Sequence, residues 1–196
     1  ENSFDPLVLE TYNLQLIKHA EIIHETRTKF LKKLIPVFNK YYSEICNQKE
    51  KVDIEYRSHL NTDSLAVLLQ ESIEKDRFSQ HTTYGVHKDD MIFKMNGYPI
   101  KKIGSQGQQK SFLIALKLAQ FEFMYNEINY KPILLLDDIF DKLDNTRVEQ
   151  LLDLVKRNKF GQVFITDTNF ERTQSILSNT KVPFQIFHVK DGEIKI

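Results

Sequence analysis

Two segments of the chain carry residue types that proteins use in phosphate chemistry. Residues 103–111 read IGSQGQQKS, and residues 133–144 read ILLLDDIFDKLD. The first places small and amide residues at a predicted helix start, where free backbone N–H groups can bind a phosphate. The second ends an aliphatic strand with Asp137 and Asp138, and carboxylates at that end of a strand are well placed for Mg²⁺ and a water. Together the two segments predict part of an ATP site.

Each segment alone has a simpler interpretation. A serine at a helix start, such as Ser105, is most often an ordinary N-cap. An aspartate after a strand, such as Asp137, often caps a turn or the next helix. The ATP-site interpretation is favoured because both segments occur in the same chain, with a second aspartate at position 138.

The chain lacks the phosphate-binding loop that a complete ATP site needs. That loop has the form G-x-x-x-x-G-K-[ST], and none of the six glycines has this spacing. We therefore expect these 196 residues alone to be inactive toward ATP. A chain that starts with Glu1 rather than Met also fits a piece excised from a longer protein.

The composition excludes some classes of protein and leaves others open. Lys plus Arg and Asp plus Glu each number 27, so the net charge is zero and gives no general indication of nucleic-acid binding. Cys46 is the single cysteine, which excludes an internal disulfide and favours a reducing, cytoplasmic location. No apolar run approaches the roughly 20 residues of a membrane span. Three adjacent basic pairs exist, each explained at least as well by a solvated face: Lys32–Lys33, Lys101–Lys102 and Lys156–Arg157.

The first part of the chain is predicted to be mostly helical. Residues 6–46 form a long helix with an imperfect heptad pattern, and we favour a helix of a globular subdomain over a true coiled coil. Pro36 is expected to end or kink that helix. Residues 52–60 suggest a strand, and residues 64–77 suggest an amphipathic helix capped by Ser64.

The part after residue 80 alternates between strands and helices. Two strands, 91–95 and 98–103, are expected around an Asn96–Gly97 turn. The further predicted elements are helix 108–126, strand 133–136, helix 145–158, strand 162–166, helix 169–177 and strands 184–189 and 193–196. This alternation predicts an α/β fold with a partly parallel sheet.

Three motifs resemble a known family. They are GVHKDD at residues 85–90, SQGQQK at 105–110 and LLLDD followed by a Leu–Asp pair at 134–144. The last two resemble the signature, Walker B strand and D-loop of ABC ATPases. Their wording resembles the RecF family of bacterial recombination-repair proteins, whose ATPase heads are SMC-like. The resemblance implies that residues 1–80 are part of a helical arm. It also implies that residues 81–196 are the C-terminal portion of an ABC-type head, a P-loop NTPase whose phosphate-binding loop precedes this chain.

The resemblance also implies roles for single residues. Asp137 matches the aspartate that organises Mg²⁺, and Asp138 matches the catalytic carboxylate, which is usually a longer glutamate; slow hydrolysis is therefore expected. The signature, which would touch ATP held by the other subunit, comprises Ser105, Gln106, Gly107 and Gln108. The D-loop comprises Asp141, Lys142, Leu143 and Asp144. The upstream family motif contributes Gly85, His87, Lys88, Asp89 and Asp90.

The chain departs from the family pattern at three places. Val86 replaces the usual proline, and Lys88 replaces a frequent arginine, which keeps a cation but loses a bidentate fork. The position of the switch histidine reads Thr-Asp-Thr, so Thr166 or Asp167 must take its place. His87 is open to two interpretations, a catalytic base or a hydrogen-bonded loop histidine.

The function implied by the resemblance is an ATP-gated DNA clamp. ATP and Mg²⁺ would close a homodimer over gapped, single- and double-stranded DNA, and a RecR-type mediator would help to load the RecA recombinase. Two alternatives are the nucleotide-binding subunit of an ABC transporter and the head of a coiled-coil chromosome-organising ATPase. The transporter class keeps its switch histidine and usually a glutamate after Walker B. The coiled-coil class needs a longer arm than about thirty heptad-like residues.

Overall fold

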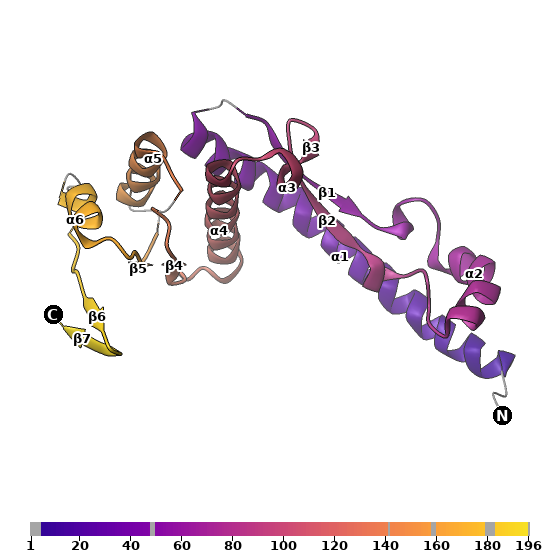
Figure 1. Cartoon of the computed structure of the whole chain (residues 1–196). Helices are drawn as coiled ribbons and strands as arrows, with labels where there is room; N and C mark the ends of the chain where they lie inside the picture. The colour runs from indigo at the N-terminus through magenta and orange to yellow at the C-terminus, as the bar shows by residue number, and fades with distance from the viewer. Residues whose placement is uncertain (1–4, 48–49, 141, 158–159, 179–182, 196) are drawn as a thin grey trace. The chain divides into compact units, whose positions relative to one another are not determined.

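The computed structural model describes residues 5–47, 50–140, 142–157, 160–178 and 183–195. Figure 1 shows the elements in chain order. They are α1 (Pro6–Cys46), β1 (Val52–Arg57), η1 (His59–Asn61), α2 (Leu65–Ser79), η2 (Val86–Lys88), β2 (Asp90–Met95), β3 (Tyr98–Pro99), α3 (Ile100–Ile103), α4 (Gln106–Ile128), β4 (Leu134–Leu136), α5 (Asn145–Lys156), β5 (Val163–Ile165), α6 (Phe170–Ser178), β6 (His188–Lys190) and β7 (Glu193–Lys195).

The chain forms two compact units. Unit 1 comprises Glu1–Lys40 and Glu50–Gly104, and unit 2 comprises Tyr41–Lys49 and Ser105–Ile196. These units are defined by packing. The predicted division into an arm up to residue 80 and an ATPase head after it concerns function, and it stays a prediction.

The long first helix is confirmed, but it does not end at Pro36. Helix α1 runs over 41 residues with Pro36 inside it. A proline within a helix costs about 3 kcal/mol because it removes one N–H donor and clashes with the preceding turn. Each fully buried large apolar side chain contributes roughly 1.5–3 kcal/mol, so the side chains around the proline outweigh that cost. The buried ones are Leu31, Leu34, Phe38, Tyr41, Tyr42, Ile45 and Cys46.

Unit 1 contains a three-stranded antiparallel sheet in the order β1–β2–β3. Its register pairs Val52 with Met95 and Arg57 with Asp90. The turn predicted between β2 and β3 is confirmed, with positive φ angles of 49° at Asn96 and 85° at Gly97. The predicted strand up to residue 103 is too long: β3 ends at Pro99, which cannot donate to a ladder, and α3 follows it directly.

The small core of unit 1 lies between α1 and α2. Ala20, Leu65 and Leu69 are buried there. The predicted cap of α2 is confirmed, since the Val67 N–H donates to Ser64 Oγ at 3.4 Å. The predicted strand from residue 52 is also shorter than expected, because η1 replaces its end.

Unit 2 contains the parallel pair that the sequence predicts. Strands β4 and β5 are hydrogen-bonded in parallel, with Leu134 opposite Val163. Helix α4 supplies much of the buried surface, including Phe112 and Leu118. The last turns of α1 pack on it, because the ring of Tyr42 meets that of Phe112 edge-on at 6.0 Å.

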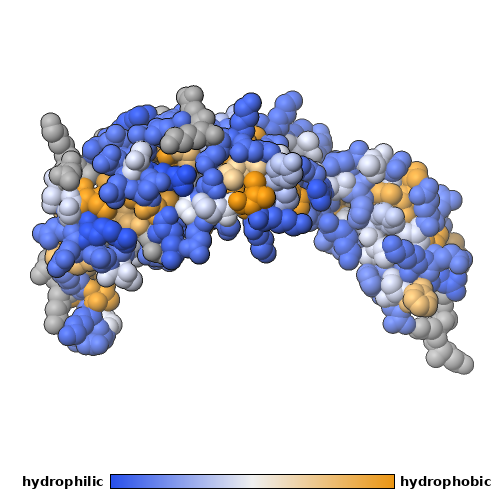
Figure 2. Space-filling model, turned by 45° about the horizontal axis from the view of Figure 1, so that its top comes forward, coloured by the Kyte–Doolittle hydropathy of each residue, from blue (hydrophilic) through white to orange (hydrophobic). Residues whose placement is uncertain are grey.

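Figure 2 shows hydrophilic side chains over most of the visible face, with smaller hydrophobic groups among them. In the part of the chain that the structure describes, no helix is long and apolar enough to cross a membrane.

Candidate functional site

The two predicted carboxylates lie directly after β4. Asp138 has a φ of 48°, in the left-handed region that aspartate tolerates better than most residues. This local reversal buries the next two side chains, Ile139 and Phe140, which are 2% and 1% exposed. Asp137 is exposed and Asp138 is half-buried. The chain therefore anchors itself in the core immediately after the acidic pair and leaves both carboxylates at the strand end.

Thr166 joins the two aspartates. The parallel register places Leu136 opposite Ile165, and the Thr166 N–H donates to the Leu136 carbonyl at 3.0 Å. The Thr166 hydroxyl donates to Asp137 Oδ1 and accepts the Asp138 N–H at 3.0 Å. Of the two residues predicted for the switch position, Thr166 is therefore the one that contacts the acidic pair. We call Asp137, Asp138 and Thr166 the acidic edge.

Asp167 has a different environment. Its side chain is 2% exposed, and Arg172 donates to both of its oxygens at 2.9 Å. The Asn169 N–H and the Thr173 hydroxyl also donate to it, at 3.0 and 3.1 Å. Burial raises the pKa of Asp167, but the hydrogen bonds from Asn169, Arg172 and Thr173 together lower it below its ordinary value. Through these hydrogen bonds, the Asp167 carboxylate stabilises the start of α6.

Replacing Asp167 is therefore expected to affect stability. We expect Asp167→Asn to lower the unfolding free energy by about 2–4 kcal/mol at pH 7, because buried donors lose a charged acceptor. Since the folded pKa is lowered, this contribution is complete above about pH 4 and is lost as pH falls through the folded value. Urea unfolding at pH 7 and below pH 4 measures both effects.

A matched control is Asp153→Asn on α5. Asp153 pairs with Lys156 at 3.0 Å on the exposed surface, so its replacement should change stability by less than about 1 kcal/mol. Equal effects of the two substitutions would contradict a structural role for Asp167.

The signature residues form the start of α4. Ser105 is the N-cap: the Gln108 N–H donates to Ser105 Oγ at 3.3 Å, and the Ser105 N–H donates to Gln108 Oε1 at 2.8 Å. This reciprocal capping box satisfies two donors at the helix end. Gln106 is exposed. The simpler interpretation of this segment as a helix cap is thus correct for its local structure, and its contact with a nucleotide stays a prediction.

The signature glycine packs on the predicted D-loop of the same chain. A Cβ atom at Gly107 would lie 2.8 Å from the Lys142 carbonyl oxygen and 3.2 Å from the Arg147 guanidinium. Only a residue without a side chain fits there. Lys142 itself has a positive φ of 65°.

The rest of the predicted D-loop leads into α5. Asp141 lies outside the described residues, Leu143 is half-buried and Asp144 is exposed. Asp144 caps α5 by accepting the Arg147 N–H at 2.9 Å. The D-loop assignment of these residues stays a prediction.

One contact of this site was not predicted from the sequence. Lys110 Nζ, on α4, lies 4.0 Å from Asp138 Oδ2. The lysine belongs to the SQGQQK segment, but its spacing from Asp138 in sequence gives no indication that the two side chains meet. The structure therefore connects the helix that carries the signature to the second aspartate.

The acidic edge suits a Mg²⁺ ion that arrives with a nucleotide. Asp137 and Thr166 offer hard oxygen ligands, and both residues are exposed. Within the described ranges, no three His, Cys, Asp or Glu side chains gather as a metal centre made by protein alone. Mg²⁺ commonly takes one or two carboxylates and completes its shell with phosphate oxygens and waters, so the residues present fit that mode.

The upstream motif GVHKDD folds as a structural loop of unit 1. Asp89, whose side chain is 4% exposed, pairs with Arg27 of α1 at 2.6 Å and accepts the Tyr56 hydroxyl. Burial and this bond to Asp89 raise the pKa of Tyr56. His87 Nε2 lies 3.1 Å from the Thr82 carbonyl oxygen. This contact supports the loop-histidine interpretation of His87.

Of the other residues of the motif, Gly85 is constrained by its backbone conformation, and Lys88 and Asp90 face solvent. Gly85 has a φ of 136°, and a Cβ there would meet the His87 ring at 3.0 Å. Lys88 and Asp90 are exposed. Their family roles stay predictions.

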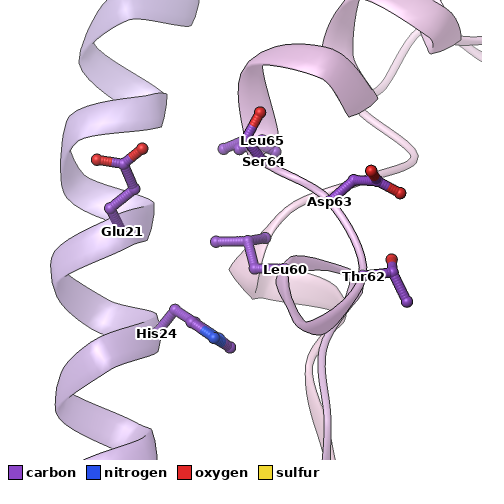
Figure 3. A pocket seen from close by; sticks show the side chains of 7 residues that line it. All are labelled: Glu21, His24, Leu60, Thr62, Asp63, Ser64 and Leu65. Atoms are coloured by element: carbon purple, nitrogen blue, oxygen red, sulfur yellow. The ribbon is translucent and has the colours of Figure 1, made fainter.

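A separate pocket of about 270 Å³ lies in unit 1. Figure 3 shows Glu21 and His24 of α1 on one side and the segment before and at the start of α2 on the other. None of the predicted site residues lines it.

Comparison with known proteins relates the chain to one group of relatives. No family model matches it. DNA replication and repair protein RecF of Flavobacterium johnsoniae is 50% identical over 188 residues, covering 96% of this chain and 52% of that protein. The protein of the same name from Parabacteroides distasonis is 45% identical over 195 residues, covering 100% of this chain and 53% of that protein. The chain thus spans about half the length of the curated relatives it matches.

Solved structures agree on the fold. The recombination mediator protein RecF–ATP of the RecFOR pathway matches with a TM-score of 0.77 and 27% identity, over 100% of this chain and 52% of that one. The RecF–ATPrS structure matches with a TM-score of 0.73 and 26% identity, over 98% and 51% of the two chains. The predicted fold class, part of an ABC-type ATPase head with α/β structure, is confirmed.

Proposed function

The chain belongs to the RecF family of DNA replication and repair proteins, and from this premise we propose that it is part of an ATP-dependent, dimerising DNA clamp. The full-length protein would bind gapped DNA through its single- and double-stranded parts. A RecR-type mediator would be its partner, and loading of the RecA recombinase the outcome. A phosphate-binding loop outside these 196 residues would complete the nucleotide site.

The observation that carries the proposal is the acidic edge. Two carboxylates follow β4. The hydroxyl of Thr166, which follows the parallel strand β5, donates to the Asp137 carboxylate and accepts the Asp138 backbone N–H. Such a set suits an ion and a water beside the phosphates of a nucleotide. Bound Mg²⁺ would neutralise charge on the phosphate oxygens. Asp137 would coordinate the ion directly or accept a hydrogen bond from a water bound to it, and Thr166 would hold that carboxylate in place.

Asp138 would act on the attacking water. Its backbone is fixed by the Thr166 hydroxyl and by the burial of the two residues that follow. Its side chain remains 43% exposed, so a water can reach it. An aspartate is one methylene shorter than the glutamate usual at this position in ABC ATPases, which fits slow hydrolysis used to time release.

The signature would act across the dimer. The N-terminus of α4 presents exposed residues Ser105 and Gln106, and the start of a 23-residue helix favours an anion. The proposal is that this end meets the ATP held by the partner subunit. Nucleotide binding would then close the dimer, and hydrolysis would open it.

Sedimentation of the full-length protein tests the proposal. We expect a dimer with ATP and Mg²⁺ and a monomer with ADP, because only the γ-phosphate completes the contact between subunits. A gapped DNA duplex should be retained by the ATP form and released after hydrolysis, as measured by fluorescence anisotropy. A protein that stays monomeric with ATP, or that binds DNA equally with ADP, would refute the clamp.

A further inference from the structure

The start of α4 contacts the segment that carries Asp138, the proposed catalytic aspartate. Lys110 Nζ lies 4.0 Å from Asp138 Oδ2, with side chains 23% and 43% exposed. Three residues earlier on the helix, Gly107 lies against the Lys142 carbonyl, with no room for a side chain. Two contacts, one ionic and one steric, therefore join the signature helix to the chain on either side of residue 140.

The side chain of Asp138 is less constrained than its backbone. The backbone N–H is held by Thr166, and the left-handed conformation is fixed before two buried residues. Among the described residues, Lys110 is the cation that pairs with the carboxylate. At 4.0 Å the pair is ionic without a direct hydrogen bond, so the carboxylate can follow the ammonium group as α4 shifts.

We infer that Lys110 is a positioning residue that couples the two ATP sites of the dimer. The inference rests on the proposed function, in which the signature of one subunit meets the nucleotide of its partner. Asp138 of that same subunit acts on the other nucleotide. Binding of one ATP to Ser105–Gln108 would fix the position of α4. Through its ion pair, Lys110 would then fix the position of the Asp138 carboxylate at the second ATP.

Capping of α4 alone does not account for the position of Lys110. A helix cap requires Ser105 and Gln108, which satisfy each other. It does not require a lysine one turn further along whose ammonium group faces the acidic edge. Coupling of the two sites predicts that ATP turnover depends on ATP concentration with a Hill coefficient above one.

The test uses the full-length protein with Lys110→Met and Lys110→Arg. Lys110→Met should keep ATP-dependent dimerisation and a KM for ATP within about twofold of the original. Its kcat should fall about tenfold, and its Hill coefficient should fall to one, since Asp138 loses its link to α4. Lys110→Arg keeps the positive charge and should restore most of both values. Lys117→Met, an exposed lysine on the same helix, is the matched control and should change neither.

Several outcomes would overturn the inference, and they separate it from the proposed function. If the unmodified protein dimerises with ATP but Lys110→Met keeps its kcat and Hill coefficient, the coupling is refuted and the clamp stands. A Hill coefficient of one in the unmodified protein would likewise refute the coupling and leave the clamp standing. If the unmodified protein does not dimerise, both fail. Thermal melting and the Lys110→Gln variant control for misfolding. If Lys117→Met shows a shift in melting temperature and a loss of kcat equal to that of Lys110→Met, the inference is also overturned.

Discussion

In the full-length protein, Asp138→Asn is expected to trap the ATP-bound dimer, whereas Asp137→Asn is expected to weaken Mg²⁺–ATP binding itself. An amide at position 138 cannot accept a proton from the attacking water, so hydrolysis should fall by about 10²–10⁴-fold. Asparagine tolerates the left-handed backbone found there, with φ of 48°, so the fold should persist. Asp137→Asn removes the charge that would face the ion and should weaken nucleotide binding about 10–100-fold.

Single-turnover hydrolysis and equilibrium nucleotide binding separate the two effects. Thr166→Val supplies the comparison, since it keeps both carboxylates and removes the hydroxyl that joins the Asp137 carboxylate to the Asp138 backbone N–H. It should impair both measurements, and Thr166→Ser, which keeps a hydroxyl, should impair them less. If Asp137→Asn and Asp138→Asn both hydrolyse ATP at the original rate, the acidic edge has been misassigned.

Ser105→Arg is expected to give the opposite oligomeric state to Asp138→Asn. Binding of ATP to each monomer should remain nearly intact, while ATP-dependent dimerisation and retention on DNA are lost. The reason is geometric, because in the proposed clamp the exposed N-terminus of α4 faces the nucleotide of the partner. A long cation there would occupy the space of the γ-phosphate and block the N–H groups at the helix end. Analytical ultracentrifugation with ATP and Mg²⁺ distinguishes the trapped dimer expected for Asp138→Asn from the monomer expected for Ser105→Arg.

The capping role of Ser105 requires its own control. Loss of an N-cap costs about 1 kcal/mol by itself, and Ser105 accepts the Gln108 N–H. Ser105→Ala removes the cap without adding bulk, and Ser105→Asn keeps a capping side chain. Both should dimerise far better than Ser105→Arg. Normal dimerisation by Ser105→Arg would mean that this segment serves only as a helix cap.

The structure separates the buried, arginine-paired carboxylates from the exposed ones. Asp89 and Asp167 are both buried carboxylates paired with an arginine, through Arg27 and Arg172 respectively. Each fixes a loop, and neither carboxylate is open to a nucleotide. Asp137, by contrast, is exposed at a strand end and needs only the Thr166 hydroxyl to hold it. Its exposure therefore favours Asp137 over the two buried acids as the proposed residue for Mg²⁺.

The sequence alone determined the features that depend on a few consecutive residues. Ser64 and Ser105 cap helices because their hydroxyls accept N–H groups only three residues away. Asn96–Gly97 forms a turn because both residues tolerate positive φ. The acidic pair follows a strand because the aliphatic run before it buries Leu134 and Leu136. The α/β class followed from the order of such local elements.

Only the tertiary structure decided which distant residues meet. Helix α1 continues through Pro36 because packing of surrounding side chains outweighs a local penalty. Thr166 rather than Asp167 contacts the acidic pair because of the register of β4 against β5 and because Arg172 pairs with Asp167. The pairing of Lys110 with Asp138 likewise joins residues 28 positions apart in the printed sequence. Such contacts are set by how helices and strands pack, and a sequence pattern that repeats every two to four residues carries no information about that packing.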